Sequence, residues 1–128
     1  MRNTVAAVAI AIGACATPAL SEGDAAAGEK VFKKCAACHA VGDSARNKSG
    51  PMLNGIVGAT VGSVDGFRYS KALEEKRDEG MVWDAANLSA YLEKPRDFIP
   101  GGKMAFAGLR KEEDRLNVIA YLETHGAN

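Results

Sequence analysis

The sequence lacks an excess of either charge, a long hydrophobic run, and more than a few cysteines and histidines. Sixteen basic and sixteen acidic side chains cancel across the 128 residues. A whole-surface field that would gather nucleic acid or anionic membrane is therefore not expected, and attraction to a partner must come from how the charges are distributed. What is present, 47% hydrophobic residues in a chain of this length, predicts one ordinary globular domain.

The longest apolar stretch, residues 5–16, is shorter than the roughly twenty residues that a membrane span needs. It follows Arg2 and precedes the small residues of "ALS" at 19–21, an order typical of a secretory signal peptide. We therefore predict a signal peptide over residues 1–21 that is cleaved on export to the periplasm. One mature domain is then expected over residues 22–128.

Three alternatives for this N-terminal segment remain open. Cleavage could fall a few residues earlier, or the segment could be a buried alanine-rich helix of the fold. Cys15, preceded by "IGA", also loosely resembles a lipoprotein processing site. In that case a lipid on Cys15 would anchor the protein to a membrane, which is the one membrane contact that we consider.

Ordinary cleavage would remove Cys15 and leave two cysteines, Cys35 and Cys38, in the run "KKCAACHAVG". A closed structural zinc site needs four ligands, and the second histidine, His125 in "ETHGAN", lacks the paired spacing of such sites. A disulfide-exchange motif normally opens a helix that follows a strand, and no convincing strand precedes Cys35. The zinc site and the disulfide-exchange motif are therefore less favoured than covalent attachment of a haem.

The run CxxCH is typical of covalent haem attachment in an exported chain. Each thiol can add to one haem vinyl group, and the histidine that follows then lies under the iron as its proximal ligand. We therefore predict one haem c with its iron, bound through Cys35 and Cys38, with His39 as a metal ligand.

The second axial position of such an iron has four candidates in the mature chain: Met52, Met81, Met104 and His125. A methionine is usually a core residue. Met104 differs because "IPGGKMAFAGL" surrounds it with proline and glycine, which predicts a tight loop able to wrap the far side of a flat cofactor. Met104 is the favoured ligand, and ligation by two histidines stays an alternative.

Five segments of the chain carry a family resemblance: "GDAAAGEKVFKKCAACHAV", "SGPMLNGIVG", "GFRYSKAL", "VWDAANLSAYLEKPRDFIPGGKMAFAGL" and "RLNVIAYLE". In the same order, they resemble segments of the class I cytochromes c, and most closely the small soluble bacterial members akin to the mitochondrial electron carrier. The resemblance covers essentially all of residues 22–128. It implies an all-α cytochrome c fold, in which three to five helices and long glycine-rich loops wrap one covalently bound haem.

The apolar spacing agrees with this fold. It predicts helices over 24–35 and 111–124, a middle helix over 85–93 that ends before Pro95, and a shorter helix over 70–77. The resemblance implies that the first and last helices cross, with Gly28 letting Tyr121 approach closely.

The resemblance also implies roles around the haem. Pro51 would accept the proton of the His39 imidazole through its carbonyl, Tyr69 and Trp83 would hydrogen-bond the haem propionates, Tyr91 would lie near the Met104 sulfur, and Phe106 would lie beside the exposed haem edge. Each of these side chains could instead be simply core. The chain departs from the mitochondrial pattern at Ala59, Gly102 and Leu73, where that pattern has arginine, threonine and often asparagine.

An iron with both axial positions filled has no open site for oxygen or peroxide, so the expected function is electron transfer and not catalysis. The resemblance implies a monomeric, mobile carrier between a quinol-oxidising cytochrome bc complex and a terminal acceptor or photosynthetic reaction centre. A ligand-binding haem enzyme or sensor, and a module tethered through Cys15 or to one enzyme, remain the alternatives.

Docking to redox partners is expected at a basic haem edge. In the family the segments bordering that edge correspond to those carrying Lys30, Lys33, Lys34, Arg96, Lys103, Arg110 and Lys111. Acidic residues gather elsewhere, in "LEEKRDEG" and "KEEDR". The alternative is that these charges only solvate the surface.

Overall fold

The structure is a computed structural model that describes residues 6–11, 13 and 23–126. It contains five helices in these segments: α1 (Ala25–Phe32), α2 (Lys71–Asp78), α3 (Ala85–Glu93), α4 (Pro95–Phe98) and α5 (Glu112–Glu123). An isolated antiparallel bridge joins Thr60 to Val82, and the described residues form no strand. The prediction of an all-α fold is confirmed.

Most of the predicted signal peptide, and Cys15 with its possible lipid anchor, lie outside the described residues, so both stay predictions. Within the described segments, no helix combines the length and hydrophobicity that crossing a membrane requires.

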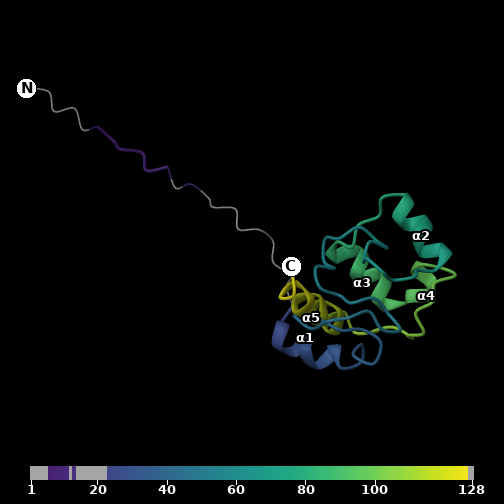
Figure 1. Ribbon diagram of the computed structural model, residues 1–128. Coiled ribbons are helices and arrows are strands. Elements are labelled where there is room, and N and C mark those ends of the chain that lie inside the picture. The colour runs from purple at the N-terminus through teal and green to yellow at the C-terminus, as the bar shows by residue number, and fades with distance from the viewer. Residues whose placement is uncertain (1–5, 12, 14–22, 127–128) are drawn as a thin grey trace, which may run out of the picture.

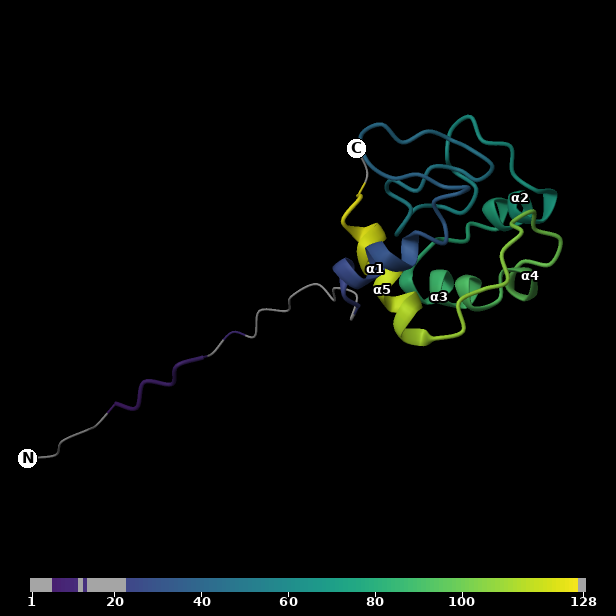
Figure 2. The same cartoon turned by 90° about the horizontal axis from the view of Figure 1, so that it is seen from below.

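Helices α1 and α5 cross at the end of the molecule where both termini of the folded part lie (Figures 1 and 2). Gly28 is buried at the crossing, where an added Cβ would overlap the Asn117 backbone and lie 2.8 Å from the Tyr121 Cβ. The rings of Phe32 and Tyr121 pack with centroids 5.4 Å apart. The close approach at Gly28 is therefore present, with the α5 backbone nearer than the tyrosine side chain.

Helix α1 begins where the sequence predicts and ends earlier. The Asp24 carboxylate accepts hydrogen bonds from the backbone N–H groups of Ala26 and Ala27, which caps the first turn. The helix was expected to reach Cys35 but ends at Phe32. Beyond it the backbone tightens, with the Cys35 N–H donating to the Phe32 carbonyl at 2.7 Å, so the cysteine motif lies on turns and not on the helix.

The middle of the chain follows its local signals closely. Helix α3 has the predicted bounds, capped by Asp84, whose carboxylate accepts from the Asn87 N–H at 2.7 Å. Lys94 leaves the helical region because the residue before a proline disfavours it. Pro95 then opens α4, a helix that the sequence did not predict, since proline is well suited to a first helical position.

The buried apolar residues form one cluster that draws on the helices and on the long loop between the cysteine motif and α2. Its members are Phe32, Ile56, Val61, Trp83, Leu88, Ile99, Leu109, Val118, Ile119 and Leu122. The loop is tied to the segment before α3 by backbone bonds from Gly58 N–H to the Trp83 carbonyl and from Trp83 N–H to the Ala59 carbonyl, 2.7 and 2.8 Å long. This pairing fixes Trp83 in the core.

Candidate haem-binding site

The two cysteines of the motif are free thiols, Cys35 half-buried and Cys38 exposed. A turn joins them, with the Cys38 N–H donating to the Cys35 carbonyl at 3.1 Å. Burial raises the pKa of Cys35, the charge of Lys34 opposes that rise, and Cys38 adds to it. In the described part of the chain, no three His, Cys, Asp or Glu side chains gather into a set that could hold a metal ion, so the zinc reading finds no ligand set there.

The His39 imidazole is held by one ring nitrogen. Its Nδ1 lies 2.7 Å from the Pro51 carbonyl oxygen, and because a carbonyl only accepts, Nδ1 carries the donated proton. The neutral ring then has an unprotonated Nε2 available to a metal. Burial lowers the pKa of His39, the bond to Pro51 opposes this, and Lys48 lowers it further. The net lowering of the His39 pKa favours the neutral imidazole, which is the form that binds a metal.

Gly50 flanks this imidazole and was not singled out from the sequence, where it reads as one glycine of a loop. It is buried, its N–H donates to the Cys38 carbonyl at 2.8 Å, and an added Cβ would overlap the His39 ring. The adjacent Pro51 was the available signal. Because the Pro51 carbonyl bonds the His39 ring, the residue next to Pro51 must also pass close to that ring.

Met104 lies on an irregular segment between α4 and α5, which we call the Met104 loop and define as residues 99–109. The Tyr91 hydroxyl of α3 lies 3.8 Å from the Met104 Sδ, in donor position. Burial raises the pKa of Tyr91, so the phenol keeps its proton and can donate. Met81, one of the rival candidates, packs instead against the core cluster.

Trp83 and Tyr91 pack together, with ring centroids 4.9 Å apart and planes inclined by 36°. Trp83 is only 5% exposed. Its indole N–H has no protein acceptor among the described residues, and no fully buried side-chain polar atom there lacks a partner. The role of this N–H toward a haem propionate stays a prediction.

Tyr69 stands apart from that aromatic pair. Its hydroxyl oxygen accepts from the Val64 N–H at 2.9 Å, which leaves the hydroxyl proton free to be donated, and its ring meets Phe67 edge-on. Phe106, from the Met104 loop, is partly buried against the core cluster. The structure thus brings together His39 with Pro51, and Trp83 with Tyr91 and Met104, while no hydrogen bond between described residues joins the two groups.

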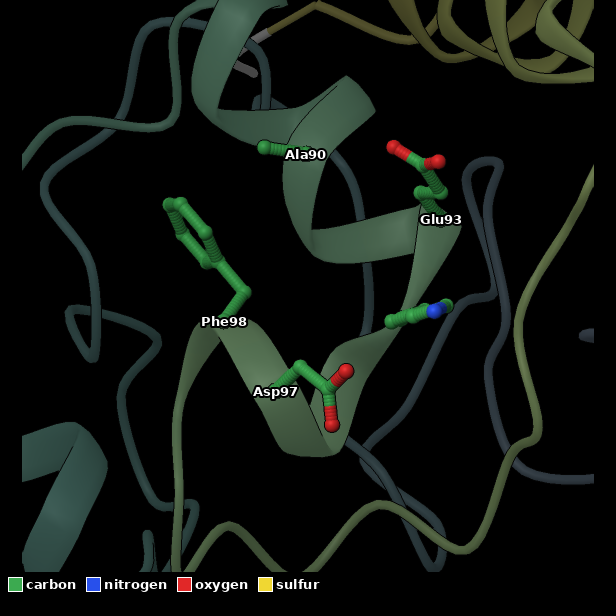
Figure 3. A pocket seen from close by; sticks show the side chains of 5 residues that line it. Ala90, Glu93, Asp97 and Phe98 are labelled. Carbon is green, nitrogen blue, oxygen red and sulfur yellow. The ribbon is translucent and has the colours of Figure 1, made fainter.

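A shallow hollow of about 310 Å³ lies elsewhere, between α3 and α4. Figure 3 shows the side chains of Glu93, Asp97 and Phe98 around it, and Ala90 and Lys94 complete the lining. None of the predicted site residues lines this hollow.

The donor set fits a covalently attached haem: two free thiols on one turn, a neutral imidazole with one nitrogen available, and a thioether held by a phenol. The sequence model of the family described as "Cytochrome c" matches residues 25–126. The chain belongs to the cytochrome c family. A cytochrome c carries one haem c with its iron and transfers electrons, so the chain is an electron-transfer protein and not an enzyme.

Individual relatives agree with this membership. The chain is 52% identical over 103 residues to cytochrome c-550 of Ancylobacter novellus, covering 80% of this chain and 96% of the relative. It is 50% identical over 101 residues to cytochrome c2 of Agrobacterium tumefaciens (strain II Chrys), covering 79% and 91%. The solved structure of cytochrome c2 from Rhodospirillum centenum superposes with a TM-score of 0.78 at 37% identity, covering 81% and 99%.

Proposed function

We propose that this cytochrome c is a mobile carrier whose haem is attached at Cys35 and Cys38 and whose iron is ligated by His39 and Met104. It would accept electrons from a quinol-oxidising cytochrome bc complex and deliver them to a terminal acceptor or a photosynthetic reaction centre. The contact between the Tyr91 hydroxyl and the Met104 Sδ carries the proposal, because it singles out one methionine and orients its sulfur.

The haem supplies an iron that alternates between ferrous and ferric states. The chain's own residues restrict that iron to electron transfer. His39, oriented by the Pro51 carbonyl, and Met104, oriented by Tyr91, would both hold the iron and so leave it no site for a substrate. Because a thioether ligand is neutral, Met104 would disfavour the extra positive charge of the ferric state and so raise the reduction potential.

Partner docking would use the surface beside the attached haem. Lys33 and Lys34 are exposed and directly precede Cys35, and Lys103 is exposed and directly precedes Met104. We propose that these cations meet acidic faces of the donor and acceptor in small, short-lived interfaces. The carrier would act as a monomer in the periplasm after loss of residues 1–21.

Replacing each methionine with alanine tests the axial ligation. The ferric protein is expected to show the weak near-infrared band of methionine-ligated haem. Met104→Ala should abolish this band, whereas Met52→Ala and Met81→Ala should retain it. Retention in Met104→Ala, or loss in either of the other two variants alone, would remove Met104 from the ligand set.

A further inference from the structure

Arg115 on α5 is a buried cation without an acidic partner. It is 8% exposed, and the ion pairs found among the described residues, Lys76 with Glu79 and Arg77 with Asp78, do not involve it. Burying a charge is costly unless hydrogen bonds replace its hydration. The groups that accept hydrogen bonds from the Arg115 guanidinium should therefore show what this residue does.

Three hydrogen bonds from the guanidinium join three segments. Its Nη1 donates to the Leu109 carbonyl at 2.8 Å and to the Arg110 carbonyl at 3.0 Å. Its Nε donates to the Ser89 hydroxyl at 3.1 Å. Leu109 is the last residue of the Met104 loop and Arg110 follows it, and Ser89 lies on α3, two residues before Tyr91.

The same end of the loop is fixed to α3 by its backbone. The Leu109 N–H donates to the Leu92 carbonyl at 2.7 Å. Gly108, at φ +116°, passes so close to the Glu93 carbonyl that an added Cβ would overlap it. Arg115 bonds both this loop end and Ser89 of α3, so the loop end is held between α3 and α5.

The stretch that carries Met104 has no comparable support of its own. The preceding anchor is the Gly102 N–H, which donates to the carbonyl of buried Ile99 at 3.1 Å. Residues 103–108 of the described structure make no backbone-to-backbone hydrogen bond. The position of Met104 therefore depends on the two ends of the loop, on the packing of Phe106 against the core cluster and on Tyr91.

We propose that Arg115 is a positioning residue that sets how firmly the Met104 sulfur is held, by clamping the end of the Met104 loop against α3 and α5. The inference rests on the proposed ligation by His39 and Met104. Without the clamp the loop end is freer to move, and lifting Met104 off the iron costs less.

Competition by imidazole for the ferric iron measures that cost in the full, haem-loaded protein. Arg115→Met keeps an apolar side chain of similar length but removes all three hydrogen bonds. Arg115→Lys keeps the charge but loses the planar guanidinium that can donate to several acceptors at once. Loss of the near-infrared band reports displacement of Met104. Arg115→Met is expected to bind imidazole about tenfold more tightly, equivalent to about 1.4 kcal/mol, and Arg115→Lys less than tenfold but measurably more tightly than the unaltered protein.

Arg46→Met serves as the matched control, because Arg46 is exposed and its replacement removes the same charge. It should leave imidazole affinity unchanged. Arg115 variants that bind imidazole as the unaltered protein does would overturn the proposal, even if their global unfolding shifted, since a purely structural residue would produce that result. If Arg115→Met does not fold, Arg115→Lys decides the question in the same assay.

Failure of the ligand assignment would look different. The unaltered protein would then lack the near-infrared band, or Met104→Ala would keep it, before any Arg115 variant is considered. A normal band that responds to Met104→Ala but not to the loss of Arg115 would contradict the clamp alone.

Discussion

Single polar groups hold each proposed axial ligand in one orientation. The Pro51 carbonyl accepts the Nδ1 proton of His39, which leaves the Nε2 lone pair for iron, and Gly50 gives the ring room to lie there. The Tyr91 hydroxyl points at the Met104 Sδ. A donor to the sulfur draws electron density from it, so the same contact that positions the ligand should also tune the iron.

Tyr91→Phe tests that tuning. Removing the donor makes the sulfur a stronger electron donor, which favours the ferric state, so the midpoint potential should fall. A hydrogen bond contributes about 0.5–1.5 kcal/mol net. Since about 59 mV corresponds to a tenfold change for one electron, and only the difference in bond strength between the two oxidation states counts, the fall should be at most about 65 mV in a redox titration.

Tyr121→Phe is the control for this substitution. Tyr121 packs against Phe32 and His125 where α1 and α5 cross, whereas the Met104 sulfur accepts from Tyr91, so the potential should not change. The near-infrared band should persist in both variants. A potential that rises or stays constant in Tyr91→Phe would show that the hydroxyl does not act on the sulfur.

At the scale of helices, local sequence signals predicted the helix ends that neighbouring residues determine. They missed the features that leave no such local signal. Asp84 and Pro95 bound α3, and both signals are adjacent to the helix, so its limits were predicted correctly. Apolar spacing continues past Phe32, but the backbone tightens there and α1 ends. Helix α4 has four residues, too few to show a period.

The site shows the same division. The cysteine motif and the loop around Met104 are local patterns, and the resemblance to cytochromes c supplied Pro51 and Tyr91. The role of Gly50 depends on contact with a residue eleven positions away, and that of Arg115 on α3 and the loop end. Arg115 nevertheless left a signal, since it shares the helical face of buried Ile119 and Leu122, where a charge is unexpected.

The crossing of α1 and α5 yields the prediction at this scale. Gly28→Ala would place a methyl group against the Asn117 backbone, which cannot rotate away as a side chain can. The free energy of unfolding should fall by about 3 kcal/mol, the upper end of the usual cost of overpacking. Denaturant unfolding followed by circular dichroism measures this loss.

Glu29→Ala is the matched control, because Glu29 is the next residue of α1 and its side chain is exposed. Its unfolding free energy should change by no more than about 0.5 kcal/mol. Equal losses in the two variants would mean that the close approach at Gly28 is not what limits the crossing.

For the whole molecule, net charge offers almost no steering. Loss of residues 1–21 would remove Arg2 as the one charged residue, leaving fifteen basic and sixteen acidic side chains and a formal charge of −1. Electrostatic attraction of a redox partner must then come from where the charged side chains lie on the surface. Lys33 and Lys34 directly precede the cysteine motif at the end of α1. The run "LEEKRDEG", with four acidic and two basic residues, lies on and just after α2, which is across the molecule from α1 in both views (Figures 1 and 2).

Charge reversal at two lysines separates local charge from net charge. Lys34→Glu, beside the cysteine motif, and Lys71→Glu, exposed on α2, change the total charge equally. In stopped-flow reduction by an acidic-faced partner at low salt, Lys34→Glu should slow the bimolecular rate by about three- to tenfold, and Lys71→Glu should have little effect. The reason is that only Lys34 lies where the partner would approach the haem.

Ionic strength supplies the second half of this test. The rate of the unaltered protein should fall steeply with salt, and the Lys34→Glu rate should fall less, because added ions screen an attraction that the variant has already lost. Near 1 M salt, where charges are screened within about 3 Å, the two rates should converge. A rate that ignores ionic strength, or equal slowing by the two reversals, would mean that encounter does not depend on a basic face beside the cysteine motif.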